Sequence, residues 1–498
     1  MSAALAALQE RLKDVNNLQK AAAILDWDQQ TYMPPGGVGA RAEQKATLAK
    51  LSHELFTDEA TGRFLSAAEA TGAENDADRA YLRVARRDYD QATKIPTALA
   101  EEGARLTALA QNAWAAARAA DDYAAFAPWL EKILDHTRRV ADCLGYRTCR
   151  YDALLDLYEP GMTCAQLDEV FGRLHPELTS LSRALYDRCA AADEQLLHQE
   201  FDEEKQRHFS EEILRECGYD FQRGRQDRSV HPFCTHFSRD DVRITTRYDR
   251  RFLPSSLFAS MHEMGHALYE QGIGASLDGN VLGSGTSLGV HESQSRLWEN
   301  LVGRSRGFWK HYYARLQGVF PAQFGEVPLE RFYRAINHVS PSLIRVEADE
   351  VTYNLHILLR YRIENRLLDG DLSVADAPEA WNESMRDLIG VVPPSNREGI
   401  LQDVHWSIGI LGYFPTYMLG TVLAAQLFDA AGRALPELPA QIERGETAPL
   451  LGWLRDNVHV HGRALFPDEL VRRATGEPLG TDAYFRYLKT KFGDLYGV

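Results

Sequence analysis

Two histidines and a glutamate near the middle of the chain have the spacing of a metal-binding helix. Residues 262–266 read HEMGH, which is the pattern H-E-x-x-H. On a helix, positions i and i+4 lie on one face about one turn apart, so His262 and His266 can bind the same metal ion. Glu263 is then placed to contact a water molecule on that ion. The spacing predicts a zinc hydrolase.

A third metal ligand must come from another element, because a catalytic zinc ion takes three protein ligands and keeps one position open for water. Glu292 lies far enough beyond His266 for a loop and a second helix to return alongside the first. His291 competes with Glu292 for this role, and spacing alone does not separate them. Glu299 falls on the same helical face as Glu292, where it either orients a ligand histidine or is an ordinary surface acid.

The rest of the chain reads as a mainly α protein. Apolar residues recur at three- and four-residue spacings from the N-terminus onward, as in Leu5, Leu8 and Leu12. The alternation in DVRIT (241–245) predicts one of very few strands, and the helix carrying HEMGH is expected to end at Gly272. Breaks between helices are expected at 33–39, at Pro96, at 159–162, at Pro176 and in the Gly-rich stretch 272–289.

Composition excludes several classes of protein. The 498 residues carry 55 Lys plus Arg against 71 Asp plus Glu, a net charge of −16, which argues against a general nucleic-acid binder. A hydrophobic content of 45% is enough for a large core and argues against disorder. Six cysteines without a C-x-x-C pair indicate neither a disulfide framework nor a thiolate zinc site.

The location expected from the sequence is cytoplasmic, without membrane contact. The N-terminal residues mix acidic and basic side chains, unlike the basic-then-apolar layout of a secretory signal. The apolar stretch 408–428 contains Pro415 and three glycines, which favours a core helix beginning at Pro415 over a bilayer span.

Several motifs resemble the thermostable carboxypeptidase Taq family, in that family's order and approximate spacing. The similarity covers essentially the whole chain. The motifs are AAILDWDQQTYMPPGG (22–37), HPF (231–233), DVRIT (241–245), HEMGH (262–266), HESQSRLWEN (291–300), IRVEAD (344–349) and GILQDVHWSIGILGYFPTY (399–417).

The resemblance implies a zinc- or cobalt-dependent metallocarboxypeptidase that removes single residues from peptide C-termini, with broad preference and poor cleavage at proline. It also implies a single helical domain over 1–498 with a fold similar to that of neurolysin, which has a long central groove and a very small sheet near the metal. Members of the family are usually homodimers. The N-terminal helical part would cover about 1–229, and the metal-site and groove part about 230–498. By position, the matches are metal ligands His262, His266 and Glu292, acid/base Glu263, and substrate-site residues His231, Arg345 and Tyr413.

An exopeptidase must also recognise the terminal carboxylate of its substrate, and arginine does this best through bidentate hydrogen bonds. Arg345 and Arg243 are the candidates, although either may instead pair with a nearby acid such as Asp349, Glu347 or Asp241. Arg243 lies on the expected strand, which we expect to pair with substrate as an edge strand. Tyr413 or His231 would donate to the developing oxyanion. His405 lies in a polar cluster that is expected either to shape the groove or to brace a zinc ligand.

Two other functions remain open at this point. A helical zinc oligopeptidase that cleaves internal bonds of short peptides would share H-E-x-x-H and the distal glutamate. An inactive scaffold that binds peptides in the same groove belongs to a different class, but the intact Glu263 argues against it.

Overall fold

The computed structural model describes residues 3–189 and 195–497. The chain forms two compact units, and each combines three separate stretches of sequence. The first unit contains residues 1–93, 192–336 and 424–479, and the second contains residues 94–191, 337–423 and 480–498. Each unit therefore takes residues from both sides of position 229. A single domain spanning 1–498 stays a prediction.

The first unit holds the H-E-x-x-H segment. Its helices are α1 (Ala3–Thr31), α2 (Val38–Thr57), α3 (Glu59–Thr71), α4 (Asp76–Lys94), α10 (Glu203–Glu216), α11 (Leu253–Gly272), α12 (Leu288–Arg296), α13 (Arg306–Val319), α14 (Pro321–Phe324), α15 (Leu329–Ile336), α19 (Leu438–Glu443), α20 (Ala448–Asn457) and α21 (Pro467–Thr475). Shorter turns are η1 (Pro35–Gly37), η2 (Gln195–Leu197), η3 (Ala275–Leu277), the π-helix η4 (Leu297–Val302) and η7 (His459–His461).

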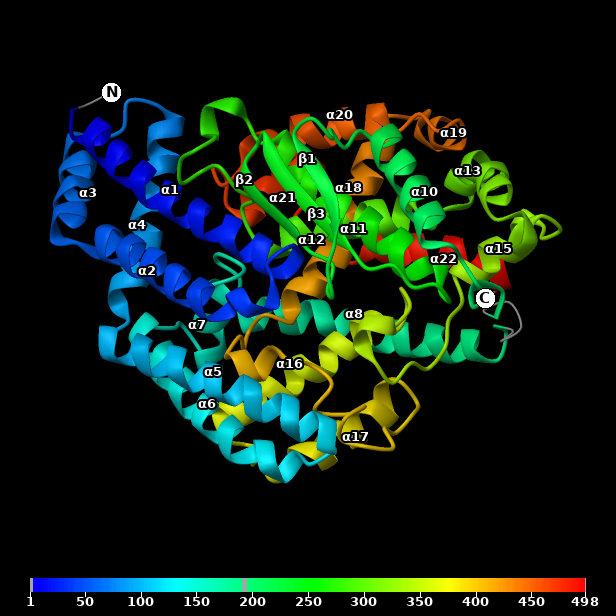
Figure 1. The fold of residues 1–498 in the computed structure, drawn as a ribbon, viewed down its shortest axis with the longest axis horizontal. Helices are drawn as coiled ribbons and strands as arrows, with labels where there is room; N and C mark the ends of the chain where they lie inside the picture. The colour runs from blue at the N-terminus through cyan, green and yellow to red at the C-terminus, as the bar shows by residue number, and fades with distance from the viewer. Residues whose placement is uncertain (1–2, 190–194, 498) are drawn as a thin grey trace. The chain divides into compact units, whose positions relative to one another are not determined.

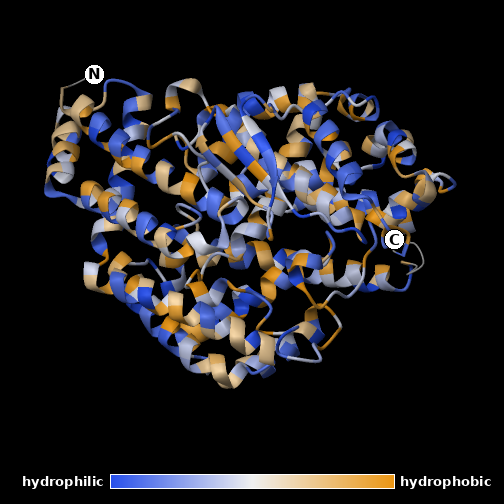
Figure 2. Cartoon of the chain, viewed as in Figure 1, coloured by the Kyte–Doolittle hydropathy of each residue, from blue (hydrophilic) through white to orange (hydrophobic). Residues whose placement is uncertain are grey.

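The apolar spacing at the start of the chain produces an amphipathic helix, as predicted. Leu5, Leu8 and Leu12 of α1 are buried in a cluster with Leu65 of α3 and Tyr81 of α4. Burying each leucine stabilises the fold by roughly 1.5–3 kcal/mol. In Figure 2, hydrophilic and hydrophobic residues alternate around the helices, as expected for helices that bury one face.

A small sheet lies against α11 (Figure 1). Among the described residues it has three strands in the order β1-β3-β2. β3 (Asp241–Thr246) pairs in parallel with β1 (Gly224–Arg228) and antiparallel with β2 (Cys234–Ser238). The Oγ1 of Thr246 donates to the Ser256 carbonyl of α11 at 3.2 Å, so the even-numbered residues of β3 face this helix.

All regular elements among the described residues of the second unit are helices. Its elements are α5 (Thr97–Ala120), α6 (Tyr123–Leu144), α7 (Arg150–Asp156), α8 (Cys164–Tyr186), α16 (Tyr353–Asp369), α17 (Ala377–Leu388), α22 (Asp482–Tyr496), η5 (Arg345–Glu347) and η6 (His405–Ile408). α18 (Pro415–Ala434) begins in this unit and continues into the first.

The mainly α fold class is confirmed, together with several local expectations. A strand forms at 241–246, the helix carrying HEMGH ends at Gly272, and α18 begins at Pro415. The break expected at Pro176 is wrong, because Pro176 lies inside α8. A proline in a helix loses one hydrogen bond, but Leu174 and Leu178 on either side of it are fully buried, and this packing offsets the loss.

The strand position expected for DVRIT is also wrong. β3 is the central strand of the sheet, hydrogen-bonded on both sides, and β2 and β1 are the edges. The alternating pattern fits a strand with one buried face in any position, so it did not locate the edge.

No helix within residues 3–189 and 195–497 has the length and apolar character needed to cross a bilayer.

Candidate active site

Two helices of the first unit bring three side chains together that could hold a metal ion. His262 and His266 lie one turn apart on α11, and Glu292 lies on α12. α12 begins after Ser287, whose side chain accepts a hydrogen bond from the Val290 N–H and caps the helix.

The two helices approach closely at Gly265. A Cβ at this position would lie 2.5 Å from the Gln294 carbonyl oxygen and 2.6 Å from the Ser295 Cα, both in α12. Any larger residue would push the helices apart, so the missing side chain of Gly265 allows Glu292 to reach the two histidines.

The three donor atoms fit a tetrahedral metal ion. The Glu292 Oε2 lies 3.4 Å from the Nε2 of His262 and 3.4 Å from the Nε2 of His266. All three donors lie within 4.8 Å of one another. Metal–ligand bonds of about 2.0–2.1 Å in a tetrahedron separate neighbouring ligand atoms by about 3.4 Å, so the two distances from Glu292 match the ligand spacing of a tetrahedral metal site.

Glu299 contacts the ring nitrogen of His262 that faces away from Glu292. Its Oε2 lies 2.9 Å from the Nδ1 of His262, which leaves the Nε2 of that ring directed toward Glu292. Glu299 lies in the π-helix η4, and Arg296 and Arg304 contact its carboxylate. Burial would raise the pKa of Glu299, but the hydrogen bond with His262 and the two arginines hold it at about 2.

His291 lies behind the second histidine rather than among the metal-binding donors. Its Nδ1 is 2.6 Å from the Nδ1 of His266, and its Nε2 is 2.7 Å from Glu270 Oε1. The other oxygen of Glu270 lies 3.5 Å from the Nε2 of His236 on β2. The hydrogen-bonded chain His266–His291–Glu270 therefore fixes the orientation of the His266 ring, and His236 lies at its end.

Sequence reasoning missed Glu270 and His236. Glu270 is one helical turn beyond His266 on the same face of α11, and this spacing was the available signal. It is only 2% exposed. No local pattern could have identified His236, because it reaches Glu270 only through the packing of β2 on α11.

Replacing Glu270 by glutamine should weaken zinc binding by about 10–100-fold, because Glu270 holds His291, and His291 in turn holds the ring of His266 in place. Competition with a chromophoric chelator measures this affinity directly. Glu326→Gln, a change at an exposed position of the same unit, is the matched control. Equal zinc affinity in the two variants would show that the hydrogen-bonded chain does not act on the metal site.

Glu263 is buried beside the donor cluster, with 7% of its surface exposed. This burial raises its pKa to about 7. Burial also raises the pKa of Cys234 on β2, and the charges of Glu263 and Glu270 raise it further. The edge strand β2 therefore runs close to both acids.

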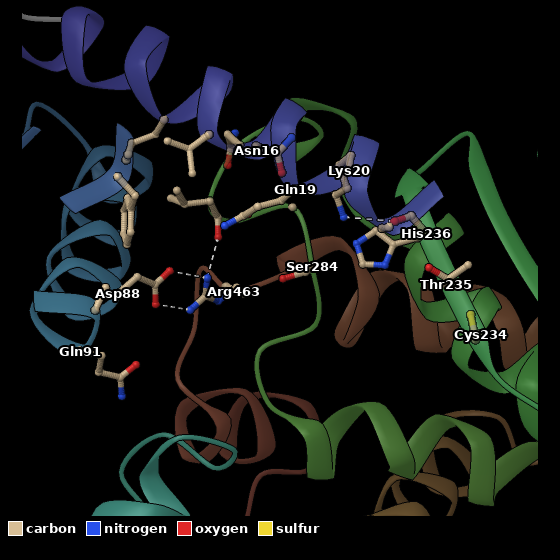
Figure 3. Close-up of a pocket in the computed structure, with 18 residues that line it drawn as sticks. Asn16, Gln19, Lys20, Asp88, Gln91, Cys234, Thr235, His236, Ser284 and Arg463 are labelled. Carbon is tan, nitrogen blue, oxygen red and sulfur yellow. Dashed lines mark hydrogen bonds and ion pairs between the residues drawn. The ribbon is translucent and has the colours of Figure 1, made fainter. Parts of the chain in front are cut away.

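A cavity of about 790 Å³ borders the same edge strand (Figure 3). Lys20 of α1 donates from its Nζ to the His236 carbonyl oxygen at 3.3 Å. Arg463 pairs with Asp88 through two contacts of 2.7 Å on the opposite wall. The polar lining also includes Asn16, Gln19, Gln91, Thr235 and Ser284.

The other two candidates of this unit lie outside the donor cluster. His231 is exposed in the loop before β2. Arg243 lies on the face of β3 opposite α11, where both ends of its guanidinium contact Asp241 at 2.8 Å. The guanidinium also stacks on Trp27 of α1 at 4.3 Å. The pairing with Asp241 considered from the sequence is therefore formed.

Arg345 and His405 belong to a buried cluster of the second unit. Asp403 contacts Arg345 at 2.9 Å through one oxygen and the Arg360 Nε at 2.7 Å through the other. Arg345 does not use Asp349 or Glu347 as its ion-pair partner. Burial is the main cause that lowers the pKa of His405, to about 3, so its ring is neutral.

Tyr413 lies in the same unit, beside this cluster. Its ring packs edge-on against Tyr158 at 5.2 Å and lies 5.7 Å from the ring of His405.

Comparison with known proteins places the whole chain in one family. The family described as carboxypeptidase Taq (M32) metallopeptidase matches residues 7–492. Thermostable carboxypeptidase 1 of Thermus thermophilus is 44% identical over 98% of both chains, and carboxypeptidase 1 of Bacillus subtilis is 40% identical over 97% of both. The crystal structure of an M32 carboxypeptidase from Deinococcus radiodurans superimposes with a TM-score of 0.97 at 42% identity, over 100% of both chains. The chain therefore belongs to the carboxypeptidase Taq (M32) family and is a metal-dependent carboxypeptidase.

Proposed function

We propose that this enzyme removes single residues from the C-termini of peptides with broad specificity, using His262, His266 and Glu292 as metal ligands. The observation that carries the proposal is the donor cluster itself, whose spacing of 3.4 Å suits a tetrahedral ion. Two imidazoles and one carboxylate favour Zn²⁺, and Co²⁺ accepts the same ligands. When bound, the metal would act as a Lewis acid toward water and the scissile carbonyl.

Glu263 is the proposed general acid/base. Its carboxylate would take a proton from the attacking water and deliver it to the amine of the departing residue. Its position directly after His262 supports this role, because its carboxylate then lies beside the donor cluster without being one of the three donors. Glu299 and the His291–Glu270 pair would hold the two ligand histidines during the reaction.

The edge strand β2 is the proposed binding surface for the peptide backbone. Thr245 N–H donates to the Phe233 carbonyl across the β2–β3 pair at 2.8 Å, so the backbone groups of the next residue, Cys234, point away from the sheet. An extended peptide can add to such an edge through backbone hydrogen bonds. The cavity beside β2 gives this peptide room for its side chains.

The substrate's terminal carboxylate is proposed to bind Arg345. Arg345 and Arg360 share one carboxylate, that of Asp403, so this buried group of three carries an excess positive charge that an anion can balance. His405 and Tyr413 are proposed substrate contacts on the strength of the resemblance and of their positions beside Arg345 in the chain's second unit. Tyr413 or His231 would donate to the oxyanion. For Arg243 the pairing with Asp241 favours a structural role over substrate binding.

A peptide with an amidated C-terminus tests the exopeptidase assignment. We expect kcat/KM to fall by at least about 100-fold relative to the free acid, because a charge-assisted bidentate contact is lost. Mass spectrometry of an N-acetylated peptide should show residues removed one at a time from the free acid. Internal fragments from both peptides would instead establish the oligopeptidase alternative, and binding without turnover would establish the scaffold.

We also propose that the enzyme works in the cytoplasm as a homodimer. The support for both is the family resemblance. Light scattering coupled to size-exclusion chromatography gives the mass in solution, and a mass of one chain would refute the dimer.

A further inference from the structure

Two cysteines of the second unit form a close pair outside the active site. Cys149 precedes α7, and Cys164 is the first residue of α8. Their sulfur atoms are 3.1 Å apart. Cys149 is partly exposed and Cys164 is buried. The pair therefore combines one partly exposed cysteine with a buried cysteine whose sulfur lies against it.

Asp152 holds the two ends of this segment in place. One of its carboxylate oxygens accepts from the Cys164 N–H at 2.7 Å, and the other accepts from the Thr148 N–H at 3.1 Å. Asp152 is itself buried, with 6% of its surface exposed. The backbone that carries both sulfurs is therefore fixed by hydrogen bonds that do not involve the thiols.

A metal ion fits this cluster poorly, although two thiols and a carboxylate are suitable ligand types. Two thiolates on one tetrahedral zinc ion, with bonds of about 2.3 Å, lie about 3.8 Å apart. The observed separation is 3.1 Å, and both oxygens of Asp152 already accept backbone hydrogen bonds. A disulfide, by contrast, requires the sulfurs to approach to about 2.05 Å, a movement of about 1 Å.

We propose that Cys149 and Cys164 are a redox-active dithiol that low-molecular-weight disulfides such as oxidised glutathione convert to an intramolecular disulfide. The Cys149 thiolate attacks one sulfur of the reagent, whose S–S bond breaks and releases one thiolate with the electron pair. Cys164 then loses its proton to solvent and attacks the Cys149 sulfur, which releases the second thiolate. Two protein thiols are oxidised and one reagent disulfide is reduced to two thiols.

The surroundings of the two sulfurs assign their order of attack. The hydrogen bond with Cys164 lowers the pKa of the Cys149 thiol, and the same contact, together with burial, raises the pKa of Cys164. Burial favours the same order, because Cys149 is the partly exposed residue of the pair and Cys164 is buried. Cys149 is the entry thiol and Cys164 the resolving thiol.

Trypsin makes the product easy to identify. Cleavage after Arg147, Arg150 and Arg173 places Cys149 in peptide 148–150 and Cys164 in peptide 151–173. The metal-loaded enzyme is treated with oxidised glutathione, alkylated and digested without reductant. We expect a disulfide-linked peptide whose mass is the sum of the two peptide masses minus two hydrogen atoms. Dithiothreitol should separate them.

Single variants test the order of the two steps. Cys164→Ser should stop at a glutathione adduct on Cys149, whereas Cys149→Ser should form an adduct on Cys164 at least about tenfold more slowly. Cys143→Ser, a change at another partly buried thiol, should crosslink like the wild type. If a variant folds poorly, the peptide map of the wild type alone decides the proposal.

Thermal unfolding gives an independent readout. The sulfurs are 15 positions apart in sequence, so their bond restricts the unfolded chain, and the oxidised wild type should have a higher Tm than the reduced form. Cys164→Ser should lack this difference. The proposal fails if oxidised glutathione leaves both thiols alkylated in the wild type, if the crosslink involves a different cysteine, or if Zn²⁺ alone protects both thiols.

Discussion

Replacing Glu263 by glutamine is expected to lower kcat by about 10³–10⁴-fold, while the enzyme keeps its bound metal. Glutamine has nearly the same size and fills the same buried site, but it cannot take a proton from water or return one to the leaving amine. Glu263 is not among the three donors, so the metal site should stay intact. Steady-state kinetics give kcat, and elemental analysis gives the metal content of the same sample.

The matched control for this variant is Glu326→Gln, which removes an exposed carboxylate from the same unit. It should have the kcat and the metal content of the wild type. A Glu263→Gln enzyme with kcat within about tenfold of the wild type would exclude Glu263 as the general base. Loss of the metal in that variant would instead assign Glu263 to the ligand set.

Replacing Glu292 by glutamine should lower zinc affinity by at least about 10³-fold, a larger loss than at any residue outside the ligand set. Glutamine keeps an oxygen near the histidines but removes the negative charge that would bind the ion. It also leaves Arg296 without the carboxylate that its Nε now contacts at 2.7 Å. Competition with a chelator measures the affinity, and activity should be lost with the metal.

The loss of zinc affinity in Glu292→Gln is to be compared with the loss in Glu299→Gln. Glu299 acts through His262, so its loss should cost only about 10–100-fold in zinc affinity, and excess zinc should restore most of the activity. The wild-type Tm should rise when zinc is added, since the metal binds the folded state, and Glu292→Gln should lack this rise. Equal effects of the two substitutions on affinity would contradict the assignment of Glu292 as ligand.

The sequence determined the helical fold class and the centre of the site because these depend on local spacing. Residues one turn apart share a face on any helix, so HEMGH implied two imidazoles on one face before any tertiary contact was known. In the same way, the apolar period at Leu5, Leu8 and Leu12 implied a buried helix face. The third ligand was open between His291 and Glu292 on spacing alone, because both neighbours can turn toward α11.

The family resemblance favoured Glu292, and tertiary packing supplies the physical reason. The close approach of α12 at Gly265 aims Glu292 at both histidines and turns His291 toward Glu270. The position of β2 at the sheet edge depends on the order of the strands, and the 3.5 Å approach of His236 to Glu270 depends on how the sheet packs against α11. Local periodicity repeats along the chain, so it can be recognised in the sequence. The contacts between α12, β2 and α11 depend instead on which surfaces pack together, and this is determined only when the whole core is formed.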